Sequence, residues 1–263
     1  MALPAAAAWQ GVGSRGGISP RWTPAHRIRS DSIGVVRLIV FFVALGILPG
    51  ATAAFLECAT RLARHPAAGW FVAGAAAGVI VCRPLLRRFP VLETFEHELT
   101  HAVAALCLLR GVRRFKVTWR RGGYVEHRSG SRLGDDLIGL APYMVPTVTF
   151  AAALLAPLAV SPARPWFFGL AGVTFGYHLV STVREIGSSF TRRGFRPPGA
   201  RREVRSDIGQ RGLVYSSAFI LAGFLLFHGV TAALLADGYG GVPIWGRALW
   251  RGTLQAGRGM LPG

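Results

Sequence analysis

The sequence contains few charged residues, and acidic residues are especially scarce. Of its 263 residues only 12 are Asp or Glu, charged residues make up 16%, and hydrophobic residues make up 51%. Together with a mean hydropathy of +0.40, this composition excludes an ordinary soluble domain. We expect an all-α polytopic membrane protein with about five to six hydrophobic helices of about 20 residues each and no large second domain.

Lysine is almost absent, because the basic residues are 29 arginines and Lys116, which leave a net charge of +18. A charge of this size also occurs in nucleic-acid-binding proteins. Here most of the arginines stand in loops beside apolar segments, where the positive-inside rule and anionic lipid headgroups account for them. We therefore expect these arginines to face a lipid bilayer, and we expect no nucleic-acid partner.

Cysteine is also scarce, with three residues at Cys58, Cys82 and Cys107. The odd number and the lack of a Cys-x-x-Cys pair argue against a disulfide framework. All three lie in or next to apolar stretches, so we interpret them as packing residues.

The distribution of apolar residues divides the chain into three parts. Residues 1–33 are rich in Gly, Pro, Ala and Arg without the pattern of a signal peptide, and they predict a disordered basic tail. Residues 34–236 form the expected membrane domain, and residues 237–263 a short C-terminal tail. The apolar segments that predict helices are 33–55, 67–82, 91–109, 137–160, 166–186 and 213–235.

The segment 91–109 carries the run His97-Glu98-Leu-Thr-His101. On a helix this spacing brings the two imidazoles onto one face as half of a zinc site, with Glu98 as the general base. The segment also contains Glu93 and Glu96, and a helix with so many ionisable groups cannot face lipid. We expect a helix that is buried in the protein.

A β-hairpin is expected directly after this helix. Phe115 to Trp119 and Tyr124 to Glu126 read as strands on either side of the turn Arg120-Arg-Gly-Gly123. The basic segments 83–90 and 188–212 lie on one side of the membrane only if the motif helix does not cross it completely. This arrangement predicts a multi-pass cell-membrane protein with a cytoplasmic N-terminus.

A catalytic zinc site needs a third protein ligand. His178 is favoured, because it lies in the middle of an apolar segment at a depth similar to that of the motif histidines. Asp207 is the alternative, although its position before the last apolar segment is also typical of a helix N-cap. The downstream candidates considered are His127, Asp135, Asp136, His178, Glu185, Asp207, His228 and Asp237.

Three features resemble the site-2 protease family of intramembrane zinc metallopeptidases, and particularly its small bacterial members, over about residues 91–230. They are the His97 to His101 motif, the Gly122-Gly123 hairpin, and the run Leu140-Ala-Pro-Tyr143 at the start of the next helix. The resemblance implies that Zn²⁺ is held by the two motif histidines and a later acidic residue. It also implies hydrolysis of peptide bonds in transmembrane or membrane-proximal proteins. The Leu-Asp-Gly signature that carries the third ligand in this family is missing.

The leading hypothesis is a zinc metalloendopeptidase that acts on a membrane-anchored protein substrate. Gly122, Gly123 and Tyr124 are candidates for pairing with an extended substrate, with a plain connecting turn as the alternative. Tyr143 is a candidate for stabilising the oxyanion, with an ordinary interfacial tyrosine as the alternative. The alternative function is a catalytically inactive, metal-binding membrane scaffold or transport component.

Overall fold

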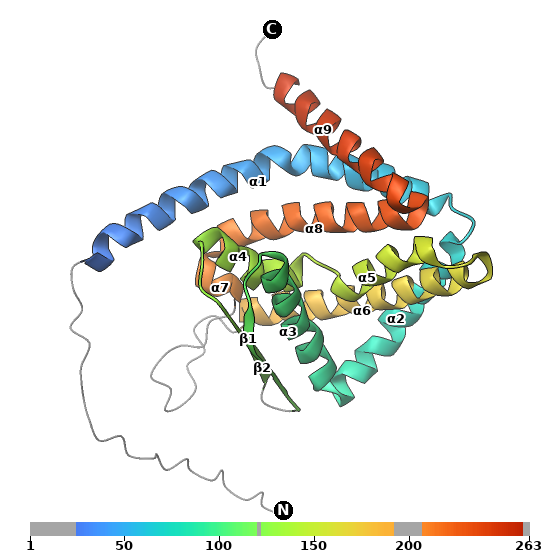
Figure 1. The fold of residues 1–263 in the computed structure, drawn as a ribbon, viewed down its shortest axis with the longest axis horizontal. Helices are drawn as coiled ribbons and strands as arrows, with labels where there is room; N and C mark the ends of the chain where they lie inside the picture. The colour runs from blue at the N-terminus through green and yellow to red at the C-terminus, as the bar shows by residue number, and fades with distance from the viewer. Residues whose placement is uncertain (1–24, 120–121, 192–206, 260–263) are drawn as a thin grey trace, which may run out of the picture.

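The computed structural model describes residues 25–119, 122–191 and 207–259. This part of the chain is mostly helical, with one two-stranded antiparallel hairpin beside the helices (Figure 1). The described residues contain four helical segments long and apolar enough to cross a membrane, or five if a bent pair of helices counts as one span. The chain is therefore a multi-pass membrane protein, as the composition predicts. The four segments are Gly34–Ala63, Ala68–Arg88, Ser161–Gly187 and Leu213–Gly259.

Helices α1 (Ala25–Ala63), α8 (Leu213–Asp237) and α9 (Gly241–Gly259) form one layer of the molecule (Figure 1). A short 3₁₀ turn, Gly238–Gly240, links α8 to α9. Helix α9 crosses α1 at Gly50 and Gly252, where a side chain on Gly50 would overlap the Leu249 carbonyl oxygen. Helix α1 begins at Ala25, within residues 1–33, and helix α9 lies within residues 237–263. Residues 1–24 of the expected tail lie outside the described residues.

Helices α2 (Ala68–Arg88) and α6 (Arg164–Thr191) pack closely through glycines. Gly74 and Gly78 of α2 face the backbone of α6, and Gly172 of α6 faces the backbone of α2. A methyl group at any of these positions would overlap a carbonyl oxygen of the other helix. Such close backbone contact is typical of helix pairs in membranes, where small residues let dispersion contacts form.

The motif helix α3 (Pro90–Cys107) is followed by strands β1 (Val112–Thr118) and β2 (Gly122–His127). Both strands lie against α3, which confirms the hairpin expected after the motif. The positive φ of Gly122, 79°, suits glycine in the turn. Residues 120 and 121 of the expected turn lie outside the described residues.

The chain then forms helix α4 (Arg132–Leu140), the 3₁₀ turn η1 (Ala141–Tyr143) and helix α5 (Thr147–Leu155), with 3₁₀ turns at 156–158 and 161–163 before α6. The segments Arg132–Tyr143 and Thr147–Leu158 meet at an angle of 82°. Proline at 142 and 146 accounts for the break, because proline removes backbone donors and clashes with the preceding helical turn. The short helix α7 (Asp207–Arg211) precedes α8.

Candidate metal centre

Helix α3 places His97 and His101 one turn apart, with their Nε2 atoms 3.0 Å from each other. Asp207, the first residue of α7, brings its Oδ2 to 3.8 Å from the Nε2 of His97 and 3.9 Å from that of His101. A point equidistant from three atoms at these separations lies about 2.1 Å from each, which is the length of a zinc–ligand bond. Among the described residues, these three side chains form the one group of His, Cys, Asp or Glu compact enough to hold a metal ion.

The other ring nitrogen of each histidine determines its tautomer. The Nδ1 of His97 lies 2.9 Å from the Glu185 carboxylate, and the Nδ1 of His101 lies 2.7 Å from the Ile138 carbonyl oxygen. Both partners can only accept, so each Nδ1 can donate its proton to its partner. Without a metal the two Nε2 atoms share a hydrogen bond. When both imidazoles are neutral, their Nε2 atoms and the Asp207 carboxylate form a donor set that fits a divalent metal such as zinc.

Asp207 is held in this position by a network of charged side chains around the buried Asp136. Arg211 donates to the Asp207 carbonyl oxygen at 3.0 Å and lies 3.5 Å from its carboxylate. The same guanidinium donates to Asp136 of α4 at 2.9 Å, and Asp136 also receives two hydrogen bonds of 3.0 Å from Arg37 of α1. Gly139 leaves room for the Arg211 guanidinium, which a methyl group there would overlap.

The charge of Asp207 follows from its neighbours. Burial by itself raises the pKa of the Asp207 carboxyl, but His97, His101 and Arg211 outweigh it and hold this pKa below its usual value. Asp207 is therefore ionised at neutral pH, as a metal ligand must be.

His178, the residue favoured as third ligand from its depth, is not part of this group. Its Nδ1 lies 3.5 Å from the carboxylate of Glu96, and its ring is tilted by 33° against that of His228 at a centroid distance of 5.6 Å. Glu185 contacts His97 through its carboxylate. The structure thus brings Asp207, the alternative candidate, to the motif histidines.

A cleft of about 330 Å³ contains the metal-ligand group and Glu98. Glu98 itself is buried, 8% exposed, and burial raises the pKa of its carboxyl above the usual range. Helix α3 is not one of the candidate membrane spans. A buried carboxylate whose pKa is raised, beside a candidate metal-ligand group, is suited to taking up a proton and releasing it again.

Strand β2 forms one wall of the same cleft through Gly123, Tyr124 and Val125. A Cβ atom on Gly123 would lie 2.7 Å from the Glu98 Cγ and 2.7 Å from the Lys116 carbonyl oxygen, so only glycine fits between the strand and Glu98. Gly122 stands in the turn, and among the described residues β2 pairs with β1 alone.

Tyr143 lies behind the histidines and not among the residues that line the cleft. It is 3% exposed, and its ring meets the ring of His97 edge to face at a centroid distance of 6.0 Å. In this position Tyr143 packs against His97.

The sequence does not predict which residues orient the candidate ligands. It offers Glu185 only as a possible ligand, and nothing in the spacing indicates its hydrogen bond to His97. The link between Arg37, Asp136 and Arg211 joins three distant segments. Charged residues beside apolar segments are the one signal that could have indicated it.

Comparison with known proteins agrees with the site geometry. Residues 70–190 match the family model described as Peptidase M50B-like. The match extends from α2 into α6 and includes His97, Glu98 and His101, but it ends before Asp207. No curated protein and no solved structure matches the chain. Residues 70–190 are therefore similar to the Peptidase M50B-like domain of the site-2 protease-like family.

Proposed function

We propose that this protein is an intramembrane zinc metalloendopeptidase that hydrolyses peptide bonds of membrane-anchored or membrane-proximal proteins. The observation that carries the proposal is the convergence of His97, His101 and Asp207 on one point, in the same cleft as Glu98. In this proposal Asp207, and not His178, is the third ligand.

Zinc, when bound, supplies Lewis acidity that makes water a nucleophile at neutral pH and polarises the scissile carbonyl. Glu98 takes the proton from the attacking water and then delivers it to the nitrogen of the leaving amine. Burial of Glu98 favours the second step, because a raised pKa keeps the carboxylic acid available as a proton donor. Glu185 and the Ile138 carbonyl keep the two imidazoles in the ligating tautomer throughout.

The edge of β2 is the proposed substrate-binding element. It lines the cleft beside Glu98, and an extended peptide that adds to it as a further strand would have its backbone next to the general base. The bare backbone at Gly123 supports this role, because a side chain there would displace Glu98.

The proposed topology has the metal centre on the cytoplasmic side. Helix α3 has 18 residues and is not among the candidate spans, so it enters the bilayer without crossing it. The end of α2, the hairpin and α7 carry arginines close to the cleft, and the positive-inside rule places such arginines in the cytoplasm. The N-terminus then lies in the cytoplasm as well.

Zinc content per chain tests the ligand assignment. We expect about one equivalent in the purified wild-type protein and in His178→Gln, and a large loss in His97→Ala and Asp207→Asn, because three ligands are needed to retain the metal. The measurement is elemental analysis of folded, monodisperse protein in detergent. Zinc that persists in Asp207→Asn but is lost in folded His178→Gln would contradict the assignment.

The second candidate function is a metal-binding membrane scaffold without turnover. It shares the ligand geometry but needs no general base. The two functions therefore differ in whether activity requires the carboxylate of Glu98.

A further inference from the structure

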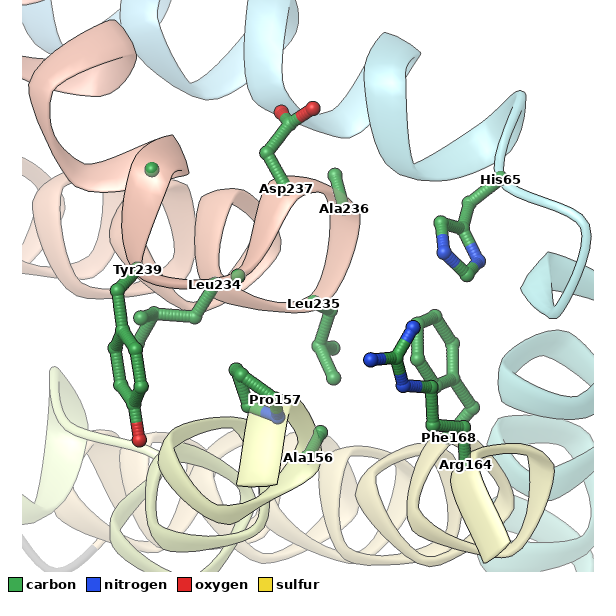
Figure 2. Close-up of a pocket in the computed structure, with 12 residues that line it drawn as sticks. His65, Ala156, Pro157, Arg164, Phe168, Leu234, Leu235, Ala236, Asp237 and Tyr239 are labelled. Atoms are coloured by element: carbon green, nitrogen blue, oxygen red, sulfur yellow. The ribbon is translucent and has the colours of Figure 1, made fainter. Parts of the chain in front are cut away.

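A second cavity, of about 510 Å³, lies at the other end of the helices (Figure 2). Its walls come from the turn between α1 and α2, the beginning of α6, the end of α8 and the 3₁₀ turn at 156–158. The first residues of α6 line it, whereas Glu185 at the metal centre lies 21 residues further along the same helix. At 1.5 Å per residue this places the cavity about 30 Å from the metal centre.

The cavity wall is mixed, and its apolar part is formed by residues such as Pro157, Phe168 and Leu235. Two side chains that can donate hydrogen bonds, His65 and Arg164, extend into the cavity beside Leu235 (Figure 2). The cavity is therefore amphipathic, with its hydrogen-bond donors at one side.

His65 is a donor towards the cavity. Its Nδ1 accepts a hydrogen bond of 3.1 Å from the Ala67 backbone N–H, so the neutral ring carries its proton on Nε2. The ring stacks on Phe168 with a centroid distance of 4.6 Å and an interplanar angle of 15°, which fixes its orientation.

Arg164 provides the positive charge. Among the described residues no carboxylate forms a salt bridge with it, and its Nε makes only a long contact, 3.4 Å, with the Ala159 carbonyl oxygen. The acidic residue at the rim, Asp237, turns its carboxylate towards α1 (Figure 2), where Arg61 binds it through hydrogen bonds of 2.7 and 3.0 Å. The charge of Arg164 is therefore not neutralised within the cavity.

The position of the cavity indicates where an anion would come from. Arg164 stands three residues after the start of the candidate span Ser161–Gly187, and Arg61 two residues before the end of Gly34–Ala63. This is the level at which a helix leaves the apolar core of a bilayer and meets the lipid headgroups. A basic pocket between membrane helices at this level can hold an anionic headgroup through charge-assisted hydrogen bonds to its phosphate.

We propose that this cavity binds the headgroup of an anionic phospholipid. The phosphate accepts hydrogen bonds from the Arg164 guanidinium and the His65 Nε2–H, while the glycerol and the first acyl carbons lie against Leu235, Pro157 and Phe168. The proposal does not depend on peptidase activity, because the cavity shares no residue with the metal centre.

The experiment measures lipid binding to the full-length protein, purified and delipidated in neutral detergent. Phosphatidylglycerol and phosphatidylcholine are added in separate titrations, and bound lipid is counted by native mass spectrometry. We expect wild type to retain one phosphatidylglycerol in preference to phosphatidylcholine. Arg164→Gln should weaken this binding about fivefold, the effect of one arginine at an anionic headgroup, and Arg164→Lys should keep most of it.

Arg64→Gln is the matched control, because it removes the same charge from an exposed residue next to His65 that does not line the cavity. Equal weakening in Arg64→Gln and Arg164→Gln would overturn the proposal, as would equal binding of the two lipids. Displacement of the lipid by millimolar inorganic phosphate would also overturn it, because it would identify a site for the free anion. Unchanged zinc content and circular dichroism in Arg164→Gln establish that the variant is folded.

Discussion

At the scale of single residues, the candidate metal centre consists of three side chains, and their other contacts determine which of their atoms could bind a metal. Glu185 occupies the Nδ1 of His97, the Ile138 carbonyl occupies the Nδ1 of His101, and Arg211 contacts one carboxylate oxygen of Asp207. The remaining atom of each side chain faces the common point. Binding of a metal therefore requires little rearrangement of side chains, which lowers the entropic cost of forming the site.

Replacing Glu98 with Gln separates the two candidate functions at this scale. The amide keeps the shape of the side chain but cannot accept a proton, so the rate of peptide hydrolysis should fall by about 10²- to 10⁴-fold while zinc content stays at the wild-type level. The measurement is cleavage of quenched-fluorescent casein by the protein in detergent. Glu126→Gln, an exposed residue of the hairpin, is the control. Wild-type turnover in Glu98→Gln would leave the scaffold as the better account.

At the scale of elements, two short segments complete a site that α3 only begins. Helix α7 has five residues, and it is held against α4 because Arg211 contacts both Asp136 and the Asp135 carbonyl oxygen. The buried Asp136 is compensated by Arg37 as well, which avoids the cost of an unpaired charge in an apolar interior. The hairpin closes the other wall of the cleft.

The close contact between β2 and α3 predicts that a larger residue at Gly123 lowers turnover. In Gly123→Ala the new methyl group overlaps Glu98 and the Lys116 carbonyl, so either the general base or the strand must move. A displacement of about 1 Å near the reacting atoms can reduce turnover about 10²-fold, and zinc content should not change. Casein cleavage and elemental analysis are the two readouts.

Gly111→Ala serves as the control for this variant, because its new methyl group would meet only Arg128 at 3.5 Å, an ordinary contact. Full activity in Gly123→Ala would show that the close approach of β2 to Glu98 has no part in catalysis. Loss of zinc in Gly123→Ala would instead indicate a general disruption of α3.

At the scale of the whole molecule, helices distant in sequence are joined by glycine contacts and buried charge networks. The α2–α6 and α1–α9 pairs come together where glycines remove side chains from the interface. Such packing matters in a membrane, because burying apolar side chains gives no hydrophobic gain relative to lipid. The metal centre adds a further link, since α3 and α7 are separated by the hairpin and by α4 to α6.

Removal of zinc should therefore lower the stability of the whole protein. At a free zinc concentration of one hundred times the dissociation constant, binding contributes about 2.7 kcal/mol, so a chelator should lower Tm and added zinc should restore it. Thermal unfolding in detergent, followed by circular dichroism, measures the effect. Asp207→Asn should show a low Tm that does not respond to the chelator. An unchanged Tm in chelated wild type would mean that bound zinc does not link α3 to α7.

The sequence by itself determined the class of the protein and half of its candidate site. Long apolar segments require helices in a bilayer, because no other open structure satisfies backbone hydrogen bonds there. The His-Glu-x-x-His spacing defines a face of a single helix, so the arrangement of His97, Glu98 and His101 is a local property, and so is the hairpin, whose turn residues are adjacent in the chain.

Only the tertiary structure decided the third member of the group. Depth along a helix suggested His178, but depth does not say which face of the neighbouring helix a side chain meets, and His178 meets Glu96. Asp207 reaches the histidines because Arg211 pairs with Asp136, a contact between residues 75 positions apart. The sequence assigned the charges of Arg37 and Arg211 to membrane orientation, but both pair with the buried Asp136 at this junction, because an apolar interior tolerates an aspartate only when it is paired.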